Sequence, residues 1–233
     1  MPDAMDLVAI GQALSVWLVP VIVAITFHEA AHGWMAERLG DPTAKLMGRV
    51  TFNPIKHVDP VGTFLLPGLL LLVHAPFLFG WAKPVPVRFE YLNNPKRDMI
   101  WVALAGPGIN LLLAFLSALA LHLVWPPNGE LTSWISENLQ NAIFINVILA
   151  VFNMMPLLPL DGGRVLCGLL PRAYALRFAR TERYGLLILL ALLFLIPMAA
   201  RSFGTDFNPV VEILWPPIRF MLELIFDLAG HPT

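Results

Sequence analysis

Charged residues are scarce in this chain. Of its 233 residues, 13% are Asp, Glu, Lys or Arg and 58% are hydrophobic. A soluble domain carries about 25% charged and about 45–50% apolar residues, so this composition indicates a membrane protein. Four stretches without a charged side chain approach or exceed the roughly 20 residues that a membrane-spanning helix needs. They are residues 7–27, 99–125, 138–160 and the shorter 184–200.

Cysteine is almost absent as well. The single Cys167 excludes a disulfide within the chain and a metal site built from several thiolates. A bound metal ion must therefore use nitrogen and oxygen ligands. The chain also lacks the basic tract that nucleic-acid binding requires, which excludes that class of partner. Asp3 and Asp6 stand where a signal peptide has Lys or Arg, so the first apolar stretch predicts a retained anchor.

The basic residues that are present fall mostly into three clusters. They lie at residues 38–56, 83–97 and 164–183, whereas residues 126–137 contain none. By the positive-inside rule, we expect all three clusters to be cytoplasmic. The apolar residues 61–79 lie between two of these clusters, so they predict a re-entrant segment that enters and leaves on the same side. A further full span is the alternative.

Two other segments complete the expected fold. Residues 48–53 have the composition of a short strand and predict a β-hairpin near the cytoplasmic face. In residues 210–230 the charged side chains share one helical face, which favours an amphipathic helix in the membrane interface, although a span stays open. We therefore expect an all-α polytopic membrane protein with about four to six transmembrane helices, a re-entrant segment and a short β-hairpin.

The first apolar stretch runs into a pattern with metal-binding chemistry. His28 and His32 are four residues apart, so they lie on one face of a helix and can bind one Zn²⁺ ion. Glu29 lies one step around the helix, where it could reach water at the metal. Ionisable residues on a membrane helix are costly, which favours a functional site. The alternative is a polar turn where the helix leaves the bilayer.

A catalytic zinc ion needs a third protein ligand, and Asp161 is the best candidate. It directly follows the stretch 138–160, which by the orientation above ends at the same membrane face as His28. Pro159 and the pair Gly162–Gly163 flank it and could aim the carboxylate sideways. Without the two histidines, a simple Asp-Gly turn would explain this residue.

Five segments carry a resemblance to a known family: residues 28–32, 53–63, 80–86, 105–110 and 153–163. They resemble the site-2 protease family of intramembrane zinc metalloproteases, in its compact prokaryotic form without a PDZ or CBS domain. The resemblance implies that His28, His32 and Asp161 bind one zinc ion and that Glu29 is the general base. It also places the segment 153–161 near the substrate backbone.

Asn110 and Asn153 are amides inside apolar stretches, where an unsatisfied amide is expensive. Each could bind the substrate backbone or the oxyanion of the reaction, or could simply bond a neighbouring helix. We predict substrate binding by both, with Asn153 favoured because it is closer in sequence to Asp161.

These observations predict one membrane-embedded metalloprotease domain over residues 1–233, with a catalytic core at about 7–165 and C-terminal helices at about 183–230. It would hydrolyse peptide bonds in or near transmembrane segments of other proteins, close to the cytoplasmic face of the plasma or inner membrane. The expected partners are transmembrane protein substrates and the lipid bilayer, and the oligomeric state stays open. The alternatives are a membrane metal transporter and a catalytically inactive regulatory homologue.

Overall fold

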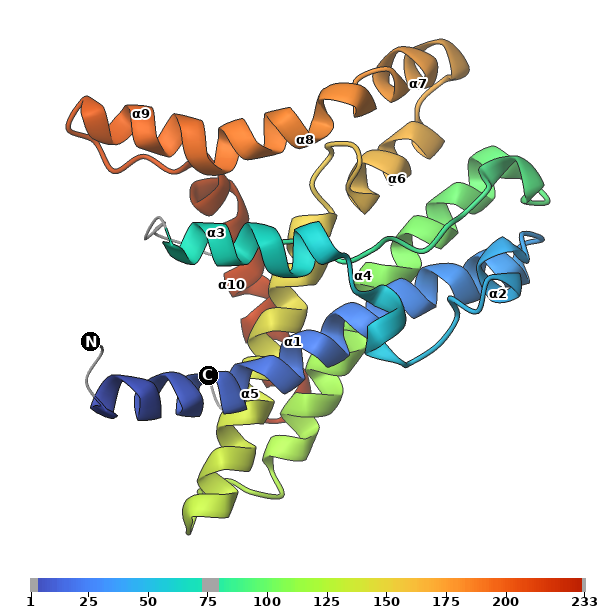
Figure 1. Cartoon of the computed structure of the whole chain (residues 1–233). Helices are drawn as coiled ribbons and strands as arrows, with labels where there is room; N and C mark the ends of the chain where they lie inside the picture. Colours follow the sequence, from blue (N-terminus) through green and yellow to red (C-terminus); the bar gives the residue numbers. More distant parts are fainter. Residues whose placement is uncertain (1–3, 73–79, 232–233) are drawn as a thin grey trace.

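The computed structural model describes residues 4–72 and 80–231, and every regular element among them is helical (Figure 1). The elements, in chain order, are α1 (Ala4–Arg38), α2 (Thr43–Leu46), the 3₁₀ turn η1 (Pro54–His57), the π-helical turn η2 (Pro60–Leu65), α3 (Leu66–Leu72), η3 (Phe89–Tyr91), α4 (Pro95–Leu121), α5 (Glu130–Asn153), α6 (Asp161–Leu169), α7 (Arg172–Ala179), α8 (Glu182–Leu190), the π-helical turn η4 (Ala191–Leu195), α9 (Ile196–Ser202) and α10 (Pro209–Ala229).

Four of these helices are long and apolar enough to cross a membrane. They cover Gly11–Arg38, Pro95–Leu121, Glu130–Asn153 and Glu182–Ser202, the last formed by α8, η4 and α9 together. The predicted membrane protein is therefore confirmed. The helices differ at their ends from the charge-free stretches: α1 continues eleven residues beyond Phe27, whereas α5 ends at Asn153 and leaves residues 154–160 outside the helix.

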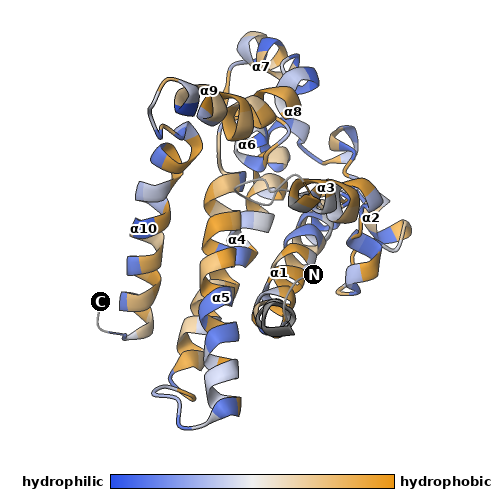
Figure 2. Ribbon diagram, turned by 60° about the vertical axis from the view of Figure 1, so that its left-hand side comes forward, coloured by the Kyte–Doolittle hydropathy of each residue, from blue (hydrophilic) through white to orange (hydrophobic). Residues whose placement is uncertain are grey.

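The core lies between α4, α5 and α10. Small side chains let these helices approach closely, because Ala114 and Ala118 of α4 are completely buried against Ile143 and Val147 of α5. Helix α10 adds Leu214 and other apolar residues to the same cluster. Hydrophobic residues prevail along α4 in Figure 2, whereas the short α7 mixes hydrophilic and hydrophobic residues. Helix α4 also packs against α1 and α6, and this brings the two predicted ligand segments together.

The predicted β-hairpin is wrong, because residues 48–53 form turns and bends and no strand occurs in the described part of the chain. Local contacts satisfy this segment instead. The carbonyl of Thr51 accepts a hydrogen bond from His57 Nε2 at 3.0 Å, and the Asn53 side chain accepts one from the Ile55 N–H at 3.1 Å. The ring of Phe52 stacks on Phe27 with ring centroids 4.3 Å apart.

The apolar segment 61–79 is helical from Pro60 through Leu72, and residues 73–79 lie outside the described residues. The Trp81 N–H donates to the Gly62 carbonyl at 3.1 Å, so the residue that follows this segment lies next to its beginning. Its relation to the membrane stays a prediction.

Helix α10 covers the predicted amphipathic segment. It buries residues such as Leu214 and Ile218, while Arg219 and Glu223 form an exposed ion pair with a 2.7 Å contact. Its charge keeps it out of the candidate spans, and its place in the interface stays a prediction.

Candidate metal centre

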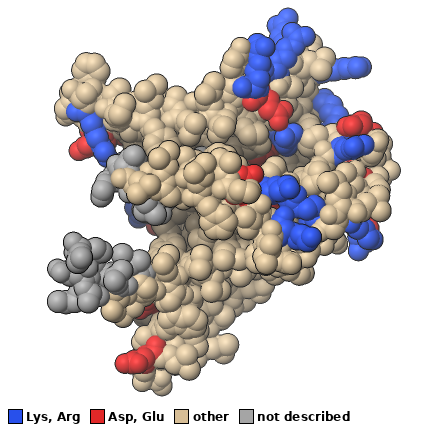
Figure 3. All heavy atoms as spheres, viewed as in Figure 1, with Lys and Arg blue, Asp and Glu red and all other residues tan. Residues whose placement is uncertain are grey.

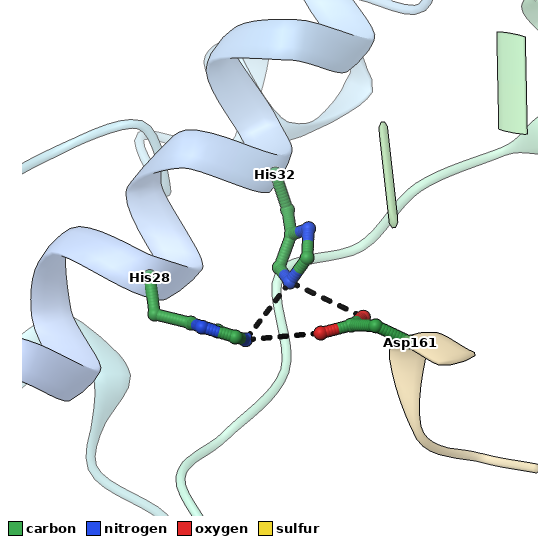
Figure 4. Close-up of side chains that lie close together, drawn as sticks. All are labelled: His28, His32 and Asp161. Carbon is green, nitrogen blue, oxygen red and sulfur yellow. Dashed lines mark hydrogen bonds and ion pairs between the residues drawn. The ribbon is translucent and has the colours of Figure 1, made fainter. Parts of the chain in front are cut away.

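Three side chains converge between α1 and the start of α6 (Figure 4). The Nε2 atoms of His28 and His32 are 3.0 Å apart. Asp161 Oδ2 lies 3.2 Å from the first and Oδ1 lies 3.4 Å from the second. The side chains of His28, His32 and Asp161 are only 9%, 12% and 12% exposed. The four-residue spacing on one helix and a carboxylate from a distant segment thus form one compact group.

Hydrogen bonds behind the rings orient both imidazoles. His28 Nδ1 donates to Asn110 Oδ1 at 2.6 Å, and His32 Nδ1 donates to the Val102 carbonyl at 2.7 Å. Both partners come from α4. Because each Nδ1 carries the hydrogen, each Nε2 presents a lone pair toward Asp161, which is the tautomer that a metal ligand needs.

The group fits a divalent cation. Two nitrogen lone pairs and a carboxylate face one another, and Asp161 Oδ2 is buried without a hydrogen-bond partner in the described structure. These groups repel one another unless a cation lies between them. Two imidazoles and one carboxylate are also a recognised ligand set for catalytic zinc, with a fourth position left for water or substrate.

A glycine makes room for the rings. A Cβ atom at Gly106 of α4 would collide with His32 Nε2 and with Cε1 of His28, whereas one at Gly108 would meet nothing within 4 Å. The backbone of α4 at Gly106 therefore packs directly against the two imidazoles. Only the first glycine is sterically required.

The turn before α6 aims Asp161 at the histidines. Gly162 and Gly163 pack so tightly on the backbone of residues 154–158 that a Cβ at either would collide with it. The chain can therefore fold back directly after α5 and start α6 at Asp161.

Glu29 lies in the same pocket but outside the ligand group. Its Oε2 accepts a hydrogen bond from the Val85 N–H at 2.7 Å. Gly33 allows this approach, because a Cβ there would lie 3.0 Å from Val85 Cγ1. The pocket measures about 590 Å³ and is lined by α1, α4, α5, α6, α8 and residues 80–89. This arrangement gives a carboxylate that is held in place and free to accept a proton.

The two predicted amides occupy different places. Asn153 lines the pocket, and its Nδ2 donates to the Leu149 carbonyl of its own helix at 2.9 Å. Asn110 is completely buried behind His28 and makes all of its hydrogen bonds to protein groups. Substrate binding by either stays a prediction, and the position of Asn153 favours it.

Sequence reasoning assigned no individual role to three residues of this region: Gly106, Asn146 and Val85. Asn146 is 2% exposed in α5 and accepts a hydrogen bond from Asn110. A second amide in an apolar stretch was a signal for it, because a buried amide needs a partner. No sequence pattern indicated the contact of the Val85 N–H with Glu29, because the backbone contacts of an irregular segment depend on how it folds.

Comparison with known proteins places the chain in a family. The model of peptidase family M50 matches residues 16–141 and 122–196. The chain belongs to peptidase family M50. Its membership makes it a metallopeptidase of the membrane with zinc as its metal, and agrees with the group of His28, His32 and Asp161.

Three relatives support this assignment, and each name describes its protein as a candidate zinc metalloprotease. YwhC of Bacillus subtilis is 36% identical over 215 residues, which cover 91% of this chain and 89% of the relative. Rip2 of Mycobacterium tuberculosis is 29% identical over 209 residues, 90% of this chain and 72% of the relative. MJ0611 of Methanocaldococcus jannaschii is 32% identical over 152 residues, 64% of this chain and 68% of the relative. No solved structure matches the chain.

Proposed function

We propose that this M50 peptidase hydrolyses peptide bonds in or near transmembrane segments of other proteins, with His28, His32 and Asp161 as zinc ligands and Glu29 as the general base. The observation that carries the proposal is the convergence of two imidazoles from α1 and a carboxylate from α6 beside a separate glutamate. A transporter has no need for that glutamate, and an inactive homologue has no reason to keep it in place.

Zinc, when bound, supplies Lewis-acid catalysis by acidifying water and polarising a carbonyl. The protein supplies proton transfer. Glu29 takes a proton from the attacking water and passes it to the leaving amine, so one carboxylate serves both halves of the reaction. The Val85 N–H holds Oε2 of Glu29 and leaves Oε1 for the water. Throughout the reaction, the Nδ1–H groups of His28 and His32 keep donating to Asn110 Oδ1 and to the Val102 carbonyl.

The pocket wall suits an apolar polypeptide. Ile25, Leu149, Phe152 and Leu186 from three different helices line it around the polar group. A transmembrane helix hides its carbonyls in hydrogen bonds, so it must unwind before one reaches the site. Asn153 is an amide in this wall and is close in sequence to Asp161, which supports a contact with the unwound backbone.

Residues 80–87 offer a backbone partner for such a substrate. The N–H groups of Trp81, Lys83 and Val85 donate to the Gly62 carbonyl, the His57 carbonyl and Glu29. Alternate donors on one side are typical of extended chain, and this leaves Ala82 facing the other way. Ala82 lines the pocket, and among the described residues its backbone has no hydrogen bond.

The distribution of charge supports a cytoplasmic position for the site. Lys and Arg gather on one side of the molecule in Figure 3, over the region where Figure 1 labels α2 and α7. The histidines lie in the second half of α1, toward that side. By the positive-inside rule, this end of the bundle faces the cytoplasm. The organisation as a single domain over residues 1–233 stays a prediction.

The experiment is cleavage of a transmembrane protein substrate by the purified peptidase, in liposomes, with and without a chelator. Glu29→Gln should retain zinc by elemental analysis and lose cleavage, because it removes the base without removing a ligand. Cleavage by the chelated protein, or full activity of Glu29→Gln, would overturn the proposal. Zinc flux that survives Glu29→Gln while no cleavage is seen would favour a transporter.

A further inference from the structure

A chain of hydrogen bonds links His28 to the backbone of α5 through two buried amides. Asn110 Oδ1 accepts from His28 Nδ1 at 2.6 Å. Asn110 Nδ2 donates to the Ala24 carbonyl at 3.2 Å and to Asn146 Oδ1 at 2.7 Å. Asn146 Nδ2 in turn donates to the Ala142 carbonyl at 2.8 Å. Both amides are at most 2% exposed.

The Ala142 carbonyl, at the end of this series of hydrogen bonds, fixes which group donates and which accepts in each of them. The Ala142 carbonyl can only accept, so the amide nitrogen of Asn146 must point to it and the Asn146 oxygen must point to Asn110. Asn110 then has to present its nitrogen to Asn146 and to Ala24. Its oxygen is left for His28, whose Nδ1 must carry the hydrogen.

We propose that Asn110 and Asn146 are positioning residues that fix the tautomer and the ring orientation of His28 for zinc binding. The inference rests on the proposed function only in taking His28 as a ligand. It gives α5 a task in the metal site although α5 contributes no ligand. The ring of His28 cannot rotate or shift its proton without leaving a buried amide unpaired, which is costly in an apolar interior.

The comparison of the two ligand histidines explains why side chains are needed here. His32 Nδ1 meets the carbonyl of Val102 on α4 directly. At His28 the neighbouring α4 residue is Asn110, and an amide presents a donor as readily as an acceptor. A second amide, itself held by a helix carbonyl, removes that ambiguity.

The test measures zinc affinity by competition with a chromogenic chelator, in Asn110→Leu, Asn146→Leu and the double variant. Loss of an outer partner of a ligating histidine weakens metal binding by about 10- to 100-fold, and we expect that range for each single variant. Because Asn146 acts through Asn110, the double variant should bind zinc no more weakly than Asn110→Leu. The visible absorption of the Co²⁺-loaded protein should change in both single variants.

Asn141→Leu is the matched control. Asn141 is also an α5 amide, and it donates to the Val16 carbonyl of α1 at 3.1 Å, away from the ligands. We expect its zinc affinity to stay within about twofold of the unchanged protein, since it lies outside the ligand network. Thermal unfolding of all variants in chelator shows whether they fold. Asn146→Leu does not touch His28, so it carries the test even where Asn110→Leu fails to fold.

Unchanged zinc affinity in Asn146→Leu, an equal loss in Asn141→Leu, or a double variant whose loss is the product of the single losses would each overturn the inference. Failure of the proposed function looks different. In that case the unchanged protein binds no zinc, or His32→Ala binds it equally well. If zinc binding depends on His32 but on neither Asn110 nor Asn146, only the positioning role of the two amides is contradicted.

Discussion

The helices packed around the candidate metal centre and the later apolar helix that lines the pocket are buried to different extents. In α1 and in α4, 33% of the most apolar 18-residue window is buried, compared with 17% in Glu182–Ser202. Helices α1, α4 and α5 pack against one another. Helix α8 meets the rest at fewer points, including Leu189 in the pocket and the ion pair between Glu182 and Arg164.

This difference separates two tasks. Metal binding depends on the tightly packed helices, where a shift of one side chain has no free space to relax into. The looser α8 contributes pocket wall but no ligand. Changes that reach the candidate ligands or their hydrogen-bond partners in the first region should therefore weaken or abolish zinc binding. Changes in the second region should alter only the handling of substrate.

The largest effect should come from Gly106→Ala. The new methyl group occupies the space of both imidazoles, so we expect zinc content near zero and no detectable cleavage. Gly108→Ala, two residues away in the same helix, adds its methyl group in open space and should retain both. Elemental analysis and cleavage of the same preparations measure this. A zinc-loaded, active Gly106→Ala protein would show that the ligand region is not tightly packed.

Asn153→Leu should have the next largest effect. Asn153 lines the pocket but lies outside the ligand group, so zinc content should not change. Loss of a polar group that stabilises the oxyanion lowers turnover by about 10²- to 10³-fold, and we expect a loss near the lower value. Steady-state kinetics on one transmembrane substrate measure it, with Asn141→Leu as the control in the same helix. Unchanged kinetics would remove Asn153 from the substrate site.

Glu182→Ala should have the smallest effect. It breaks the 2.9 Å contact with Arg164 that ties α8 to α6. A partly exposed ion pair contributes about 0.2–1 kcal/mol, so loosening α8 should raise kcat/KM for membrane substrates by no more than about fivefold, without loss of zinc. Glu223→Ala breaks a similar pair on α10, far from the pocket, and should change neither. Lost zinc in Glu182→Ala would contradict the division into two regions.

The sequence predicted the membrane character from local patterns, and it also predicted the three side chains that the structure brings together, whose role as zinc ligands stays a prediction. His28 and His32 share a helical face by their spacing alone, and Asp161 follows from charge topology and the resemblance. The wrong β-hairpin shows where local patterns fail. Residues 48–53 have strand-like composition, but hydrogen bonds from His57 and within the Asn53 turn satisfy their backbone instead. Gly106 and Asn146 act through contacts between helices, which spacing along one helix does not encode.

The most direct test of the account is X-ray absorption at the zinc edge on the purified protein and on Asp161→Ala. We predict two imidazole ligands at about 2.0–2.1 Å, oxygen in the remaining positions and no sulfur. In Asp161→Ala we predict either no zinc or a site that has lost one protein oxygen. A sulfur ligand from Cys167, or a spectrum that is the same in both proteins, would contradict the convergence of His28, His32 and Asp161 on one ion.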